Sequence, residues 1–168
     1  MQQFLIGISG ALLGVIGWLL VGMYIQRRLH DRQARDAARA VYFEVGANHL
    51  MVFTALEYGS FGSLSRVTFD RLLPELATWL PAAELQAVVL SYLGHAGYTQ
   101  MAEEADLPAD VRRAALSALL ETCRVAGELL QRRAFTPQET ASLGKYVSAQ
   151  NAEFMQAAES ASRARPDE

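Results

Sequence analysis

The feature that most constrains this chain is an apolar run near its N-terminus. Residues 4–25 contain no Asp, Glu, Lys, Arg or His. As a helix that rises about 1.5 Å per residue, the run is roughly 33 Å long, close to the roughly 30 Å of a bilayer core. Because backbone polar groups in lipid must pair within the segment, the run predicts one membrane-spanning helix. The alternative is a cleaved secretory signal, which typically has a shorter apolar region and a basic start.

Arginines follow this run and predict its orientation. Residues 27–39 hold five arginines against two aspartates, whereas the N-terminal side offers only the α-amino group. Positively charged segments stay in the cytoplasm, so we expect the N-terminus outside and the remaining chain in the cytoplasm. Arginines at lipid headgroups also attract anionic lipids. The residues expected at the membrane surface are Arg27, Arg28, Arg32 and Arg35.

Four glycines share one side of the expected membrane helix. They recur every three or four residues and are Gly7, Gly10, Gly14 and Gly17. Small residues let two helix backbones approach closely, which is a means of association in lipid. Glycine is also simply common in membrane helices. We expect this glycine stripe to pack against a membrane helix of another protein or of a second copy.

Composition restricts the class of partner. The net charge is −3, and because residues 27–39 carry +3, residues 40–168 carry −6. This acidic body argues against nucleic acid, which requires a basic face. The single cysteine excludes an intrachain disulfide and a thiolate metal cluster. It is Cys123, and its place on an apolar helical face predicts a small buried hydrophobe.

Apolar residues beyond the run recur at helical spacing, without sustained alternation, so we expect no sheet. The first helix is expected to continue to about Tyr58, where the turn-rich residues 59–65 follow. Thr68 is expected to cap the next helix, and residues 84–101 are expected to form the one after it.

Two further helices complete the expected bundle. Residues 109–133 have the clearest amphipathic pattern, with charged residues opposite the apolar face. Thr136-Pro137-Gln138-Glu139 is a capping box with proline at the first helical position. It predicts a last helix with Leu143, Tyr146, Val147, Phe154 and Ala158 on its inner side.

The predicted fold is all-α, with one N-terminal transmembrane helix followed by a small cytosolic bundle of four or five helices. The expected regions are the anchor (1–25), a basic juxtamembrane helix (26–39), the helical bundle (40–161) and a disordered tail (162–168). The layout resembles that of many single-span bacterial proteins, which implies the inner (cytoplasmic) membrane as the location.

Sequence patterns typical of catalysis are absent. The chain contains no H-E-x-x-H, repeated E-x-x-H, phosphate-binding loop, G-x-S-x-G or EF-hand pattern. A reaction requires convergent acid, base or metal groups, and none can be assembled from the sequence. We therefore expect no enzyme, no cofactor and no metal site.

Two polar groups beside apolar helical faces remain as candidate sites. The first group consists of Glu44, Asn48 and His49, and the second consists of Tyr92 and His95. Each group has the chemistry to bind a small polar ligand or to respond to protons near neutral pH. A satisfied structural network, or close helix packing at the neighbouring glycines, is the more common role.

These observations together favour a non-catalytic, single-pass scaffold or accessory subunit of a membrane protein complex. Its expected partners are membrane lipid and either a membrane protein or a second copy of the chain. The alternative is a membrane-tethered sensor or a bundle that binds a small ligand near His49 or His95.

Overall fold

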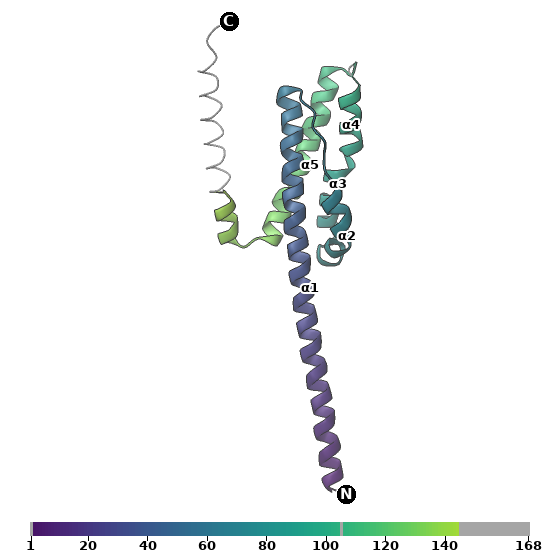
Figure 1. Cartoon of the computed structure of the whole chain (residues 1–168), viewed down its shortest axis with the longest axis vertical. Helices are drawn as coiled ribbons and strands as arrows, with labels where there is room; N and C mark the ends of the chain where they lie inside the picture. Colours follow the sequence, from purple (N-terminus) through teal and green to yellow (C-terminus); the bar gives the residue numbers. More distant parts are fainter. Residues whose placement is uncertain (1, 105, 145–168) are drawn as a thin grey trace.

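The computed structural model describes residues 2–104 and 106–144, with the backbone alone for residues 2–13 and 16. Five helices and no strand occur within these residues, which confirms the predicted all-α class (Figure 1). A further helical segment begins at residue 137 and is described to residue 144. The expected disordered tail and the expected end of the last helix lie outside the described residues.

The first helix, α1, extends over Gln2–Tyr58 and is 57 residues long. At about 1.5 Å per residue it measures roughly 86 Å. Its N-terminal part protrudes from the bundle, and its C-terminal part lies within it (Figure 1). The predicted continuation of the first helix to Tyr58 is therefore confirmed.

The N-terminal prediction of a membrane span falls partly on side chains that are not described. Among the described residues, no helix is both long enough and apolar enough to cross a membrane. Residues 4–13 of the apolar run, including Gly7 and Gly10, lie outside the described side chains. Gly14 and Gly17 are described, and no heavy atom lies within 4 Å of a Cβ built on either.

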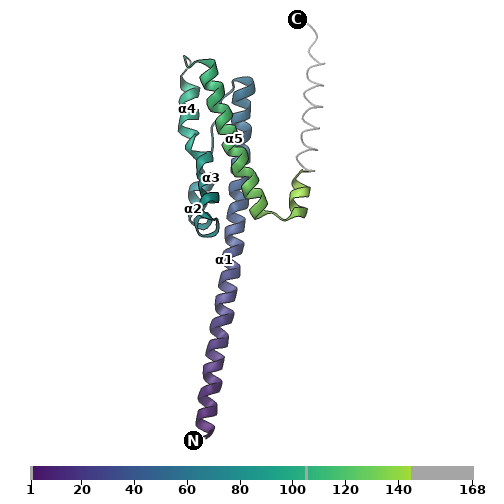
Figure 2. The ribbon, with the colours of Figure 1, turned by 180° about the vertical axis from the view of Figure 1, so that it is seen from behind.

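The other helices pack around the C-terminal part of α1. They are α2 (Val67–Trp79), α3 (Ala82–Leu93), α4 (His95–Glu103) and α5 (Ala109–Ala134). Helices α2 and α5 both pack on α1, and α3 packs on α5. Figure 2 shows α5 beside α1 and running in the opposite direction. This arrangement makes α1 the central element of the bundle.

The core follows the apolar spacing of α1 and α5. The buried apolar residues of α1 recur at helical spacing and are Ala34, Ala37, Ala38, Val41, Val45, Val52 and Ala55. This spacing keeps them on one side of the helix. Helix α5 contributes Leu116, Leu119, Cys123, Ala126, Leu129 and Leu130. Burial raises the pKa of the Cys123 thiol to about 11, as suits the predicted small hydrophobe.

The predicted helix over residues 84–101 is wrong, because the chain forms two helices that separate at Gly94. A Cβ at Gly94 would lie 2.6 Å from Leu119 Cδ1 on α5. The junction of α3 and α4 therefore approaches α5 more closely than a larger residue allows. At Gly97 a Cβ would meet nothing within 4 Å, so close packing explains only the first of these glycines.

The predicted Thr68 cap is also wrong. Helix α2 begins at Val67, so Thr68 lies inside its first turn, and the N-cap residue Arg66 makes no side-chain capping bond. The helix continues through Pro74 to Trp79 without a new start. The acceptor that serves the first turn of α2 is supplied by α1.

Candidate functional site

The carboxylate of Glu44 on α1 accepts four hydrogen bonds at the start of α2. Oε1 accepts from Ser65 Oγ at 2.7 Å and from Thr68 N at 2.8 Å. Oε2 accepts from Phe69 N at 2.9 Å and from Tyr92 Oη at 3.0 Å. The two backbone N–H groups belong to the first turn of α2, where they have no partner within the helix. Glu44 therefore caps α2 from a neighbouring helix.

The charge of Glu44 is stabilised where it lies. Its residue is only 7% exposed, and burial by itself raises the pKa of the carboxyl. The hydrogen bonds from Ser65, Thr68, Phe69 and Tyr92 together outweigh burial, and they hold the pKa of Glu44 below its usual value. The positive end of the α2 dipole also favours a negative charge at this point. Glu44 is therefore a carboxylate at neutral pH.

Asn48 lies one turn after Glu44 and fixes the connector before α2. Its Nδ2 donates to Ser65 O at 2.7 Å, and its Oδ1 accepts from Ser65 N at 2.8 Å. The Asn48 side chain is 2% exposed, and both of its polar atoms are hydrogen-bonded to the backbone of Ser65. Glu44 and Asn48 together hold Ser65 at three points.

The rings of Tyr92 on α3 and His95 on α4 complete the cluster. The Tyr92 and Phe69 rings are stacked with centroids 4.2 Å apart, and the His95 ring lies 5.2 Å from Tyr92. Burial raises the pKa of Tyr92, and the Glu44 carboxylate raises it further. Burial also lowers the pKa of His95, as does the charge of Arg66. His95 Nε2 is buried and has no hydrogen-bond partner in the described part of the chain.

The structure thus joins the two candidate groups into one, which we call the Glu44 cluster: Glu44, Asn48, Ser65, Phe69, Tyr92 and His95. His49 is the predicted member that lies elsewhere. It lines a separate cavity of about 200 Å³ between α1 and α5, together with Gly46, Gly127 and Glu128. Burial lowers the pKa of His49, which favours its neutral form.

Ser65, like Phe69, is a cluster residue that the sequence did not single out. Its side chain binds Glu44 and its backbone binds Asn48, so it links both predicted residues. A serine immediately before a helix is a recognisable N-terminal signal, but the N-cap of α2 is Arg66, and Ser65 lies one residue before it. The sequence offers no signal that its partners come from the preceding long helix.

The Glu44 cluster has the character of a structural network. The four bonds to its carboxylate match the lone-pair sites that a carboxylate offers. No group of three or more His, Cys, Asp or Glu that could hold a metal ion occurs among the residues described. The arrangement can fix α1, α2 and α3 relative to one another, which is a precondition for presenting a surface.

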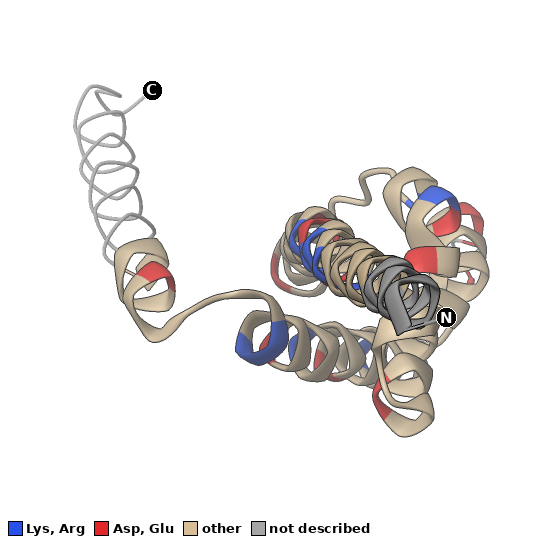
Figure 3. Ribbon diagram, turned by 90° about the horizontal axis from the view of Figure 1, so that it is seen from below, with Lys and Arg blue, Asp and Glu red and all other residues tan. Residues whose placement is uncertain are grey.

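The most exposed apolar surface is the protruding part of α1. Large apolar side chains there are at least 49% exposed and comprise Val15, Trp18, Leu19, Leu20, Val21, Met23, Tyr24, Ile25 and Leu29. The arginines predicted for the membrane surface, Arg27, Arg28, Arg32 and Arg35, are all exposed. Figure 3, seen from below, shows basic positions on α1 near the bundle.

Comparison with known proteins does not assign this chain to a family. No family model, curated protein or solved structure matches it. Function is therefore inferred from the chemistry of its own residues, above all from α1 and the surfaces beside it.

Proposed function

We propose that this chain is a non-catalytic, single-pass scaffold or accessory subunit of a membrane protein complex. In this proposal the apolar N-terminal part of α1 spans the inner (cytoplasmic) membrane, with the N-terminus outside and the bundle in the cytoplasm. One observation carries the proposal: exposed apolar side chains surround α1 on every side ahead of the bundle.

Four consecutive residues supply the argument. Residues 18–21 are Trp, Leu, Leu and Val, each between 49% and 76% exposed. Successive helical residues point about 100° apart, so these four reach all sides of α1. A partner helix would cover one side only, whereas lipid surrounds a helix completely. A helix that is apolar all round is typical of a membrane span or of the core of a large protein.

The arginines and the first core residue fix the geometry of this proposal. Arg27 and Arg28 follow the apolar run at once, where lipid headgroups would lie. The first buried residue of the bundle is Ala34, nine positions after Ile25. At 1.5 Å per residue the bundle would begin about 14 Å beyond the end of the span. Its interaction surface would therefore be held close to the membrane.

The glycine stripe supports a partner within the membrane. Gly14 and Gly17 have open space where a side chain would be, so no other described part of this chain fills that side. Small residues in lipid permit close helix contact. A membrane protein or a second copy of this chain would occupy the stripe.

The experiment is purification of the tagged full chain from carbonate-washed membranes in mild detergent, followed by identification of associated proteins. We expect a stoichiometric partner, or a homo-oligomer, that Gly10→Leu with Gly14→Leu disrupts. Ser9→Leu adds similar bulk on another side of the helix and should leave the association intact. Release of the wild-type chain by carbonate would overturn the anchor, and unchanged association of the double variant would overturn the stripe.

The sensor alternative has less support. Burial lowers the pKa of both His49 and His95, which favours the neutral form of each ring over the charged form that a proton switch requires. A melting temperature that shifts with ligand or pH, and loses that shift in His49→Gln or His95→Gln, would favour the sensor.

A further inference from the structure

A line of exposed apolar residues follows α1 through the bundle region. Phe43, Leu50 and Phe53 are 57%, 56% and 40% exposed, whereas Val52 on the opposite side of the helix is fully buried. Gly46 lies between them and is also exposed, and a Cβ there would meet nothing within 4 Å. At 100° per residue these four residues share one side of α1, and we call them the apolar line. A contiguous apolar surface of this kind commonly marks a contact with another molecule.

The same side of α1 is basic ahead of the bundle. At 100° per residue, Arg28, Arg32 and Arg35 point within about 40° of the mean direction of the apolar line. All three are exposed, and no residue in the described part of the chain pairs with any of them. This side of α1 therefore presents positive charge and apolar surface one after the other.

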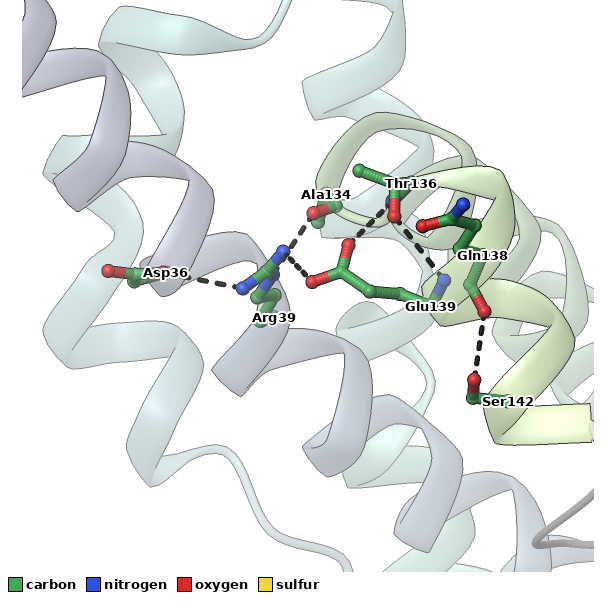
Figure 4. A network of polar contacts seen from close by, with 7 residues as sticks. All are labelled: Asp36, Arg39, Ala134, Thr136, Gln138, Glu139 and Ser142. Carbon is green, nitrogen blue, oxygen red and sulfur yellow. Dashed lines mark hydrogen bonds and ion pairs between the residues drawn. The ribbon is translucent and has the colours of Figure 1, made fainter.

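Arg39 lies on this side too and shows how the chain satisfies such a charge. Its Nη2 donates to Glu139 Oε1 at 2.6 Å, and its Nε donates to Ala134 O at 3.0 Å (Figure 4). Asp36 Oδ1 lies 3.9 Å from its Nη1. Arg39 thus has carboxylates from its own chain, which the three preceding arginines of this side lack among the described residues.

Two glycines of the apolar run continue the same side towards the N-terminus. Gly14 lies 36 positions before Leu50, which is ten full turns at 3.6 residues per turn. Gly17 stands in the same relation to Phe53. Since α1 is one helix over Gln2–Tyr58, positions ten turns apart point in the same direction. We call these two glycines, the three arginines and the apolar line the α1 outer face.

We propose that the α1 outer face binds one helix of a different membrane protein. That helix leaves the membrane beside α1, carries Asp or Glu level with the three arginines, and continues with apolar side chains against the apolar line. This partner rests on the proposed function, because it requires the N-terminal part of α1 to span the membrane. Charge complementarity sets the acidic requirement, since arginines at an interface attract carboxylates and form paired hydrogen bonds with them.

A second copy of the chain fits the α1 outer face poorly. Two copies in one membrane have the same orientation, so their α1 helices would run parallel, with equal residues at equal heights. Arg28, Arg32 and Arg35 would then meet the same arginines of the other copy. Like charges that face each other across an interface are costly. An acidic helix replaces each of these repulsions by an attraction.

Lipid headgroups reach only the start of the α1 outer face. Arg35 lies ten positions after Ile25, which is about 15 Å along the helix, whereas the headgroup layer is roughly 5–7 Å deep. Phe43 lies 18 positions after Ile25, at about 27 Å. A helix that follows α1 out of the membrane contacts the glycines, the arginines and the apolar line together.

Photocrosslinking of the full chain in its native membranes tests this proposal. p-Benzoylphenylalanine in place of Val21 or Leu50 puts a probe on the same side of α1 in the span and in the bundle, because Val21 points the same way as Arg39 five turns later. We expect one and the same protein to be captured from both positions. Leu19 and Leu93 are the matched controls, since Leu19 points about 160° away from Val21 and Leu93 is 63% exposed on α3. Neither should capture that protein.

The sequence of the captured protein and a change of charge test its chemistry. The sequence should contain an apolar run that Asp or Glu follows within about ten residues, level with the three arginines. Arg35→Glu should lower the crosslinking yield from Leu50 by about tenfold or more, because a repulsion replaces an attraction. Arg71→Glu makes the same change of charge at an exposed arginine of α2 and should leave the yield unchanged. A partner without these carboxylates, or a yield that Arg35→Glu does not lower, would overturn the proposal.

Other results contradict the proposal in distinguishable ways. Crosslinked dimers of this chain would assign the face to a second copy, and different proteins from Val21 and Leu50 would show that the face is not one surface. Lipid alone, or nothing, captured from Leu50 would remove the partner from the bundle. Carbonate extraction of the same membranes separates these results from a failure of the proposed function. A chain that resists carbonate keeps its anchor and loses this partner, whereas a chain that carbonate releases loses both.

Discussion

Removal of the Glu44 carboxylate should destabilise the bundle by several kcal/mol. In Glu44→Ala the hydroxyls of Ser65 and Tyr92 can rotate towards other acceptors, whereas the N–H groups of Thr68 and Phe69 are fixed by the helix. An unsatisfied buried donor costs about 1–3 kcal/mol, so two of them give a loss of about 2–6 kcal/mol. In Glu44→Gln one acceptor oxygen remains, and we expect a loss of about 1–3 kcal/mol.

The assay is urea unfolding of the full chain in mild detergent. A Trp18→Phe background leaves Trp79, the last residue of α2, as the only tryptophan. Its fluorescence then reports the helix that Glu44 caps. The control is Glu57→Gln, an exposed carboxylate on the same helix α1, which should change the free energy of unfolding by less than about 0.5 kcal/mol.

The stabilisation by Glu44 should also depend on pH in a defined direction. The hydrogen bonds hold the pKa of Glu44 below its usual value, so the folded state releases this proton more readily than the unfolded chain. The stability supplied by the charge is complete above the unfolded pKa of about 4.3 and is lost as the pH falls through the lower folded pKa. The gap between the wild type and Glu44→Gln should therefore shrink below about pH 4. A gap that is absent at pH 7, or constant down to pH 3, would refute the reasoning.

Two further predictions concern the core. Gly94→Val should lower the free energy of unfolding by about 1–3 kcal/mol, because Leu119 already occupies the space of a Cβ. Gly97→Ala should be neutral or stabilising by up to about 1 kcal/mol, because a Cβ there meets nothing within 4 Å. Equal effects of the two variants in urea unfolding would contradict the close approach of Gly94 to α5. Cys123 is buried and its pKa is raised to about 11, so a maleimide at pH 8 should label it only in urea; rapid native labelling would show that α5 is exposed there.

Local signals in the sequence correctly predicted two features of the fold that neighbouring residues determine. The end of α1 at Tyr58 follows from the glycine after it, whose φ of 67° is a conformation that glycine adopts readily. The capping box at Thr136 forms both of its predicted bonds. In each case the residues concerned are close in sequence, so their interaction requires no knowledge of the tertiary structure.

The Glu44 cluster shows where such reasoning stops. Glu44 and Tyr92 are 48 positions apart, and their hydrogen bond depends on how α3 packs against the core. His49 was grouped with Asn48 because the two are adjacent in the chain. Adjacent helical residues point about 100° apart, which turns His49 towards α5 while Asn48 faces Ser65. Proximity in sequence was therefore misleading at this point.

Because α1 is one continuous helix, it fixes the orientation of the bundle relative to the protruding segment. Deleting one residue between positions 26 and 33 would turn the whole bundle by about 100° about the helix axis and lower it by roughly 1.5 Å. Inserting seven residues would restore its facing to within about 20° while raising it by roughly 10 Å. The number of residues in this stretch therefore determines which side of the bundle faces a protein that contacts the N-terminal segment.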